Sequence, residues 1–184
     1  MNYCSNCSNT LKFCIPPGDD RPRFLCDACG TIHYENPKMV VGCIPEFEDK
    51  ILLCRRSIEP CFDKWTLPAG YLENGETVSD GAAREAYEEA YANVEILAPY
   101  ALFNICYVNQ VYLMFRALLI DGNFRPGNES NEVRLFTEEE IPWHNIAFTV
   151  IKETLKHYLK DRPNGLFPFY IGDILPRKKI ENAS

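Results

Sequence analysis

The sequence predicts an α+β protein, a mixed sandwich of strands and helices preceded by a small metal-binding segment. Paired strands are indicated by four apolar runs, 39–47 with 50–55 and 94–106 with 110–119. Helical character is found in an alanine-rich acidic segment, 78–91, and in an amphipathic segment, 148–159. Two Cys-x-x-Cys pairs lie within residues 1–34. Together these observations favour one sheet-and-helix domain with a small N-terminal appendage.

Size and composition fit this organisation. The chain has 184 residues, of which 46% are apolar and 24% are charged, so it can build a core of its own. No apolar run reaches the roughly 20 residues that span a bilayer. The first four residues have neither the basic nor the apolar stretch of a signal peptide. We therefore expect no membrane association and a cytoplasmic location.

The net charge and the cysteine content limit the kinds of partner and ligand that we expect for this chain. The net charge of −7 argues against broad binding to nucleic acid or to anionic membranes. A phosphate-bearing substrate would then need local arginines or a cation. The nine cysteines are an odd number, which suits intracellular thiols and metal ligands better than a disulfide framework.

The N-terminal cysteines have the spacing of a zinc ribbon. Cys4 and Cys7 form one knuckle and Cys26 and Cys29 the other, the pattern of a tetrahedral Cys4 zinc site. So short a segment buries little apolar surface, and we expect zinc to supply the missing folding energy. A redox Cys-x-x-Cys is the alternative interpretation. Few basic residues lie here, which favours a structural role over nucleic-acid binding.

Three parts are expected along the chain: a zinc ribbon over 1–36, the main domain over 37–162, and a C-terminal arm over 163–184. The arm is rich in proline and glycine before Tyr170 and carries a basic stretch after Pro176. We expect it to be extended, lying along the main domain or along a second subunit.

Turns and charged residues mark the ends of the expected strands. Glu48-Asp49 joins the first strand pair and Val108-Asn109 the second, and another strand starts at Glu132. Arg55 and Arg56 end the second strand. They are either solvated surface residues or phosphate contacts, because arginine matches phosphate geometry and stays charged.

The acidic helix carries the strongest functional signal. Thr77 and Asp80 have the pattern of a capping box at its start. Glu85, Glu88 and Glu89 stand at i, i+3 and i+4, so their carboxylates share one face and repel one another unless a cation such as Mg²⁺ is bound. Arg84 lies one turn before Glu88 and can pair with it. The opposite, packed face is expected to consist of Ala83, Ala86, Tyr87 and Ala90.

Aromatic residues follow the helix. Phe103, Tyr107 and Tyr112 have two interpretations: core or interface packing, or stacking against an adenine or flavin ring.

The segment from Gly70 to Ala92 resembles the Nudix box, Gx5Ex7REUxEExGU. The matching residues are Gly70, Glu76, Arg84, Glu85, Glu88 and Glu89. Tyr91 departs from the pattern, since the family has glycine there. The resemblance implies the Nudix fold, a mixed sheet between helices in an α/β/α sandwich.

The ribbon, the stretch NPKMVVG and the stretch LPAGYLENGE together resemble the zinc-ribbon Nudix diphosphatases that act on ADP-ribose and FAD. The resemblance implies hydrolysis of a nucleoside diphosphate derivative with release of AMP, using Mg²⁺ or Mn²⁺. Family members often form dimers, so it also implies a homodimer, and an exposed strand face with Tyr112 suits that arrangement.

Site roles follow from the same resemblance. Metal would be held by Glu85, Glu88, Glu89 and the carbonyl of Ala69, next to Gly70. Glu76 would be a further ligand or a supporting residue, with Arg84 orienting the acids. The general base is expected on the loop that carries Glu129 and Glu132, and we favour Glu129. Substrate contacts are assigned to Arg55, Arg56, Gly70 and Tyr112.

Two alternatives remain open. NAD(H) pyrophosphatases and RNA decapping enzymes also join a Cys4 ribbon to a Nudix domain, but they carry an SQPWPFP-type motif after the box, which this chain lacks. A non-catalytic nucleotide sensor or RNA-binding module usually loses the box glutamates, and this chain keeps them.

Overall fold

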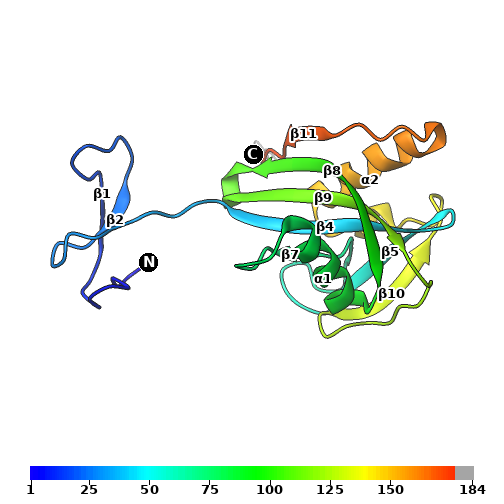
Figure 1. Ribbon diagram of the computed structural model, residues 1–184, viewed down its shortest axis with the longest axis horizontal. Helices are drawn as coiled ribbons and strands as arrows, with labels where there is room; N and C mark the ends of the chain where they lie inside the picture. The colour runs from blue at the N-terminus through cyan, green and yellow to red at the C-terminus, as the bar shows by residue number, and fades with distance from the viewer. Residues whose placement is uncertain (177–184) are drawn as a thin grey trace, which may run out of the picture. The chain divides into compact units, whose positions relative to one another are not determined.

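A computed structural model of the protein describes residues 1–176. Contacts within the chain divide it into two units, one from Met1 to Pro37 and the other beginning at Lys38 (Figure 1). The basic stretch of the expected C-terminal arm, Arg177–Lys179, lies outside the described residues. Among the helices of residues 1–176, none has the length and apolar character needed to cross a membrane.

The N-terminal unit is a small antiparallel sheet that presents two cysteine knuckles. Its strands are β1 (Lys12–Cys14), β2 (Arg23–Leu25) and β3 (Ile32–His33), in the order β1-β2-β3. Each knuckle is closed by a backbone hydrogen bond, from Ser8 to the Cys4 carbonyl at 2.9 Å and from Gly30 to the Cys26 carbonyl at 2.8 Å. Gly30 has a φ of 73°, a conformation that glycine adopts without strain.

The second unit is built on one mixed sheet of eight strands. Its main path runs β10-β5-β4-β9-β8-β11, while the short strands β6 and β7 pair with β5 and β4. The pairs β4–β9 and β8–β11 are parallel and the others antiparallel. The strands are β4 (Lys38–Phe47), β5 (Lys50–Arg56), β6 (Trp65–Thr66), β7 (Ala69–Tyr71), β8 (Val94–Ile105), β9 (Gln110–Leu119), β10 (Ser130–Phe136) and β11 (Tyr170–Asp173).

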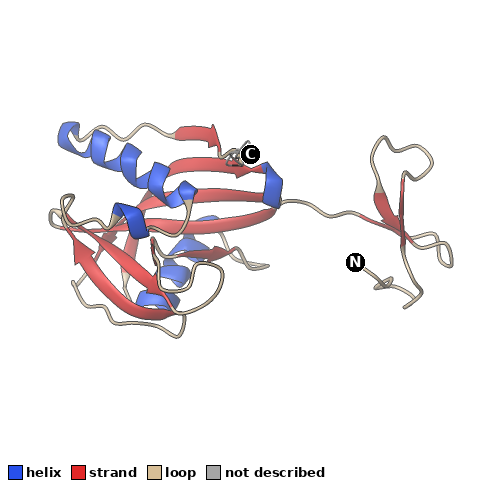
Figure 2. Cartoon of the chain, turned by 180° about the vertical axis from the view of Figure 1, so that it is seen from behind, coloured by secondary structure: helices blue, strands red, loops and turns tan. Residues whose placement is uncertain are grey.

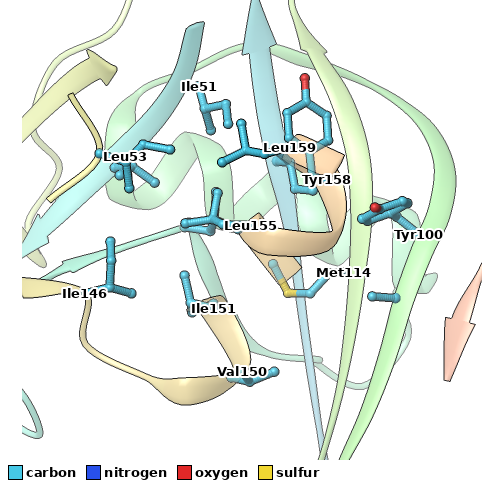
Figure 3. Packing of buried hydrophobic residues seen from close by; sticks show 14 of the residues in the cluster. Ile51, Leu53, Tyr100, Met114, Ile146, Val150, Ile151, Leu155, Tyr158 and Leu159 are labelled. Carbon is cyan, nitrogen blue, oxygen red and sulfur yellow. The ribbon is translucent and has the colours of Figure 1, made fainter. Parts of the chain in front are cut away.

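One helix packs on each face of this sheet (Figures 1 and 2). Side chains alternate along β4, so Val41 and Cys43 pack with alanines of α1 (Val78–Ala90), whereas Ile44 faces α2 (Thr149–Asp161). Figure 3 shows residues of the α2 layer, including Ile151 and Leu155 of the helix and Met114 of β9. This arrangement confirms the α+β prediction of a mixed sheet between helices.

Helix α1 starts as the sequence predicts but buries a different face. The Thr77 hydroxyl accepts a hydrogen bond from the Asp80 amide at 3.2 Å, which caps the N-terminus. The prediction that Tyr87 lies on the packed face is wrong, because its side chain is 49% exposed. The buried residues of the helix are Gly81, Ala82, Glu85, Ala86, Glu89 and Ala90, so two of the three acids point inward.

The described part of the C-terminal arm runs along the same chain and adds a strand to it. Residues of β11 pair in parallel with β8, from Tyr170 opposite Ala101 to Asp173 opposite Asn104. The buried Asp161 carboxylate accepts hydrogen bonds from the hydroxyls of Tyr100 at 2.8 Å and Tyr170 at 3.0 Å. These contacts fix the arm to the end of α2.

Candidate active site

A cavity of about 880 Å³ lies where β7, α1, β9 and the start of α2 meet. Its lining has two parts. The acidic part is centred on Glu85, Glu88, Glu89 and Glu129, with Glu59 and Glu73 also in the lining. The aromatic residues of the lining are Tyr71, Tyr87, Tyr91, Tyr107, Tyr112 and Phe148. Arg56 also lines the cavity, as do Ala69 and Gly70.

Sheet register explains why the aromatic part is continuous. Val40 of β4 lies opposite Tyr71 of β7 on one side and opposite Tyr112 of β9 on the other. Residues opposite one another project from the same face of a sheet, so both rings reach the cavity. Tyr71 lies next to Gly70 in β7, which places the aromatic part directly beside the acidic one.

Gly70 is required by the position of Glu85. A Cβ at Gly70 would collide with the Glu85 carboxylate, so only glycine lets that buried acid approach the β7 backbone. The structure therefore gives the first residue of the box a steric role at this site.

Arg84 is the centre of a network of hydrogen bonds. Its Nε and Nη2 donate to the two carboxylate oxygens of Glu76 at 3.0 and 2.8 Å. Its Nη1 donates to Glu85 at 2.7 Å and to Glu88 at 3.0 Å, and Nη2 also donates to the Tyr71 carbonyl at 3.0 Å. Glu85 and Glu88 thus converge on one nitrogen of a positive group.

Glu76 serves this network rather than the cavity. Hydrogen bonds from Arg84, and a 2.7 Å bond from the Glu73 amide, lower the pKa of Glu76 to about 2. The carboxylate stays charged and holds Arg84, which in turn touches the helix acids. This contact fits a supporting residue.

Glu89 and Glu85 are buried acids placed side by side. Burial, followed by repulsion from Glu85, raises the pKa of Glu89 to about 8, against lowering effects of Arg56 and the Ala69 amide. Burial also raises the pKa of Glu85, with repulsion from Glu88 and Glu129 adding to it. Carboxylates held together away from water are a donor set that suits a hard divalent cation. The residues present therefore fit Mg²⁺ or Mn²⁺.

Of the loop acids and arginines predicted at the site, Glu129 and Arg56 line the cavity, whereas Glu132 and Arg55 do not. Glu129 lines the cavity, and its charge raises the pKa of Glu85 and Glu89. Glu132 instead accepts a hydrogen bond from Arg55 at 3.0 Å, and Arg55 also donates to Asp63 at 2.7 Å. Both residues of that pair lie outside the cavity lining, so the structure does not bring Arg55 to the site.

Arg56 is the arginine that reaches the cavity. Its Nε donates to the Pro60 carbonyl at 2.9 Å, and its guanidinium lies 5.2 Å from the centre of the Phe148 ring. Its charge lowers the pKa of both Glu89 and Tyr112, which places it between the acidic and aromatic parts.

Of the three aromatic candidates, Tyr107 and Tyr112 line the cavity and Phe103 lies in the core. Tyr112 lines the cavity while packing against the core, and burial raises its pKa to about 12. The expectation that Tyr112 belongs to an exposed strand face available for a dimer is therefore wrong. Tyr107 lines the cavity with 55% of its surface exposed, whereas Phe103 is a core residue at 5%.

Sequence reasoning missed Tyr71 and its neighbours. The Tyr71 hydroxyl accepts a hydrogen bond from Gln110 at 2.9 Å, and the Lys38 ammonium lies 4.9 Å from the centre of its ring. Lys38 and Gln110 are opposite one another in β4 and β9. The signal for Tyr71 was its place directly after Gly70, on a strand too short to recognise.

The four knuckle cysteines form a separate metal centre. All their sulfurs lie within 4.8 Å of one another, with Cys4 and Cys29 at 3.7 Å and Cys7 and Cys26 at 3.4 Å. A tetrahedral zinc site with bonds of about 2.3 Å has sulfurs about 3.8 Å apart. Both of these pairs join one knuckle to the other, and four sulfurs gathered at such distances fit a single tetrahedral zinc ion.

Comparisons with known proteins agree with this geometry. A family model described as Nudix N-terminal matches residues 2–35, and a model described as NUDIX domain matches residues 36–157. A solved NUDIX hydrolase from Nitrosomonas europaea is similar to the chain with 54% identity and a TM-score of 0.92, covering 95% of this chain and 99% of that one.

Two curated relatives carry names of different activities. The NAD-capped RNA hydrolase NudC of Vibrio parahaemolyticus serotype O3:K6 is 26% identical over 84% of this chain, which spans 63% of the length of that relative. The ADP-ribose pyrophosphatase of Methanocaldococcus jannaschii is 27% identical over 69% of this chain and 76% of its own length.

The family model covers more than half of the chain, and four of the six box residues, Gly70, Glu85, Glu88 and Glu89, line one cavity. Nudix domains use Mg²⁺ or Mn²⁺, and the ribbon supplies four cysteines for a structural zinc ion. The chain therefore belongs to the Nudix family, as a Nudix hydrolase with an N-terminal zinc ribbon.

Proposed function

We propose that this Nudix hydrolase cleaves the diphosphate bond of ADP-ribose, of FAD, or of both, and releases AMP. The observation that carries the proposal is the two-part cavity, in which buried acids of α1 adjoin a row of tyrosines. The acids suit the charged diphosphate through a cation, and the tyrosines suit an aromatic base.

Each residue has a role in this proposal. Glu85, Glu88, Glu89 and the Ala69 carbonyl would hold Mg²⁺ or Mn²⁺. When bound, the cation neutralises the diphosphate and lowers the pKa of the attacking water. Arg84, fixed by Glu76, holds Glu85 and Glu88 in place until the cation binds.

The chain's own groups would orient the remaining reactants. Arg56 lies beside Glu89 and Tyr112 and would contact a phosphate. Glu129 faces Glu85 and Glu89 across the cavity and would accept the proton of the attacking water. Water attacks one phosphorus and the bond from that phosphorus to the bridging oxygen breaks. The products are AMP with ribose 5-phosphate, or AMP with FMN.

A second candidate is hydrolysis of NAD(H) or of NAD-capped RNA. It is favoured by the relatives named NudC, which match 84% to 92% of this chain. The same acids would act, because the bond cleaved is again a diphosphate. Binding without catalysis is the weaker alternative, since the box acids are all present.

A substrate screen tests these assignments. Purified zinc-loaded protein is incubated with Mg²⁺ or Mn²⁺ and with ADP-ribose, FAD, NAD, NADH or CoA, and products are separated by chromatography. We expect AMP from ADP-ribose or FAD at a higher kcat/KM than from NAD(H). The reverse order would replace the proposal with the second candidate, and intact nucleotide bound without turnover would favour a sensor.

Two further predictions stay with the proposed function. Four of the nine cysteines are gathered for zinc and the other five form no disulfide bond, a pattern on which we base a cytoplasmic location. A homodimer rests on the family resemblance alone, and light scattering of the purified protein tests it.

A further inference from the structure

The segment that joins β9 to β10 passes across the C-terminal end of α1. Its Arg125 amide donates to the Ala90 carbonyl at 2.8 Å, and its Gly127 amide donates to the Glu89 carbonyl at 2.9 Å. These carbonyls belong to the last turn of the helix, where no partner within the helix is available. The loop therefore caps the helix that carries the acids, two residues before Glu129.

Gly127 allows this close approach. A Cβ at Gly127 would overlap the Glu88 carbonyl oxygen, so any other residue would push the loop away from the helix. The Ser130 amide donates back to the Gly127 carbonyl at 3.2 Å, which closes a turn around Glu129. The position of Glu129 thus depends on how closely this turn sits against α1.

Tyr91, at the C-terminal end of the helix, has a left-handed backbone conformation that residues other than glycine adopt rarely. Its φ is 46° and its ψ is 29°, in the left-handed region. Its ring makes contacts that glycine could not make. The Arg125 guanidinium lies 3.9 Å from the centre of the ring, and the Tyr87 ring packs edge-on at 5.3 Å. An arginine at this distance over an aromatic face is attracted to it.

The other side of the turn is held by the segment after β5. The Ser57 amide donates to the Glu129 carbonyl at 2.8 Å, and the Ser57 hydroxyl donates to the Asn128 carbonyl at 3.2 Å. The backbone of Glu129 is therefore fastened from two directions. Its side chain lines the same cavity as the buried acids Glu85 and Glu89.

We propose that the stacked pair Tyr91–Arg125 is a positioning device that holds the Glu129 loop against α1, so that the carboxylate stays over the helix acids. The inference rests on the proposed role of Glu129 in hydrolysis. Tyr91 lines the cavity and Arg125 does not, and the proposal assigns both to positioning rather than to the chemistry itself. They act by fixing the loop backbone to the helix end, through the contact of the Arg125 guanidinium with the Tyr91 ring.

The strongest test is the Tyr91→Gly variant, compared with Tyr91→Phe. Glycine removes the ring and also removes the strain of the left-handed backbone, so we expect the melting temperature to stay the same or to rise. We nevertheless expect kcat to fall about tenfold, with KM changed less than about twofold, because the base is displaced. Tyr91→Phe keeps the stack and should retain wild-type kcat. Full kcat in Tyr91→Gly would overturn the proposal.

A double-mutant cycle then asks whether the effect passes through Glu129. Arg125→Ala should lower kcat about tenfold in the wild-type background and hardly at all in a Glu129→Gln background. Equal losses in both backgrounds would make Arg125 a direct substrate contact and would refute a positioning role. Arg134→Ala is the matched control, because that arginine also lies over an aromatic ring, Phe136 at 4.8 Å, and should change neither constant.

Hydrogen exchange separates this proposal from the proposed substrate. In Tyr91→Gly the amides of Arg125 and Gly127 should exchange faster, while the core strands keep their protection. Unchanged exchange of these amides would refute the positioning role of the pair Tyr91–Arg125, even if the enzyme were active. If the wild-type protein hydrolysed none of the nucleotides, the substrate assignment would be wrong. The exchange experiment would still show whether the pair holds the Glu129 loop.

Discussion

In residues 1–37 the buried residues are Cys4, Pro16 and Cys26, whereas the unit that begins at Lys38 has three apolar clusters of its own. Both regions gather metal-binding side chains, but for opposite reasons. In the ribbon the ligands make up most of the interior, so the metal holds the fold. In the Nudix domain the fold exists first and brings the acids together, so under the proposed function the metal would relieve a repulsion that the fold creates.

The difference also sets how each site is encoded. The ribbon's four ligands come from two short knuckles, each complete within four consecutive residues. The lining of the proposed catalytic centre comes from a helix, a three-residue strand and a loop from another part of the chain. Four experiments test this difference between the two regions.

Zinc removal should have the largest effect. Binding free energies of structural zinc are about 10 kcal/mol or more, so a zinc-selective chelator with excess Mg²⁺ should unfold residues 1–37 completely. The Nudix domain should stay folded, since its clusters do not contain the cysteine ligands. Amide NMR spectra would show this as loss of dispersed ribbon signals alone. A ribbon that keeps its dispersed signals without zinc would contradict the comparison.

Replacement of one helix acid should leave the fold intact and lower the rate. We expect Glu89→Gln to reduce kcat about 100-fold, while the melting temperature stays the same or rises, because a neutral side chain is easier to bury beside Glu85. Steady-state kinetics with Mg²⁺ and calorimetry measure the two quantities. Glu153→Gln, on an exposed part of α2, is a control that should change neither. A large drop in stability of Glu89→Gln would mean that this acid supports the fold.

The aromatic part of the cavity should affect binding more than rate. Stacking of a base on an aromatic ring contributes about 1–3 kcal/mol, so Tyr71→Leu should raise KM about tenfold with kcat little changed. Tyr71→Phe keeps the ring and loses only the hydrogen bond with Gln110. It should stay within about threefold of wild type. An unchanged KM in Tyr71→Leu would remove Tyr71 from the binding site.

The smallest effect should be a dependence of stability on pH through Glu76. Its pKa is lowered to about 2 in the folded protein, so charged Glu76 stabilises the fold above its usual pKa of 4.5. That contribution is lost as the pH falls from 4.5 toward 2. The melting temperature of Glu76→Gln should therefore be lower than that of wild type at pH 6, and the gap should narrow on acidification. A gap that does not depend on pH would contradict this.

Much of the fold could be predicted from local patterns. The expected runs 39–47, 50–55 and 110–119 match β4, β5 and β9 within one residue at each end, because alternating apolar residues and turn residues mark strands directly. The strand β11 was not predicted, because four residues carry too little periodicity. The parallel pairing of β4 with β9 joins distant parts of the chain, and no local pattern reports it.

The candidate site likewise has residues that local patterns predict and residues that they do not. The shared face of the helix acids can be predicted from their spacing along one turn. Glu129, favoured over Glu132 as the general base, lines the cavity. Arg55 has the same sequence signal as Arg56, yet their side chains differ in direction because neighbours in a strand point to opposite faces. Tyr71 and Arg125 depend on register and on loop docking, which only the folded chain displays.

The three consecutive residues of strand β7 each make a different contact at the candidate site. The Ala69 amide bonds to Glu89, Gly70 leaves room for Glu85, and Tyr71 presents a ring to the cavity. Under the proposed function, the first two residues serve the reaction and the third serves recognition of the base. A substitution of Tyr71 alone would then alter the preferred nucleotide while the neighbouring backbone still accommodates the two buried acids.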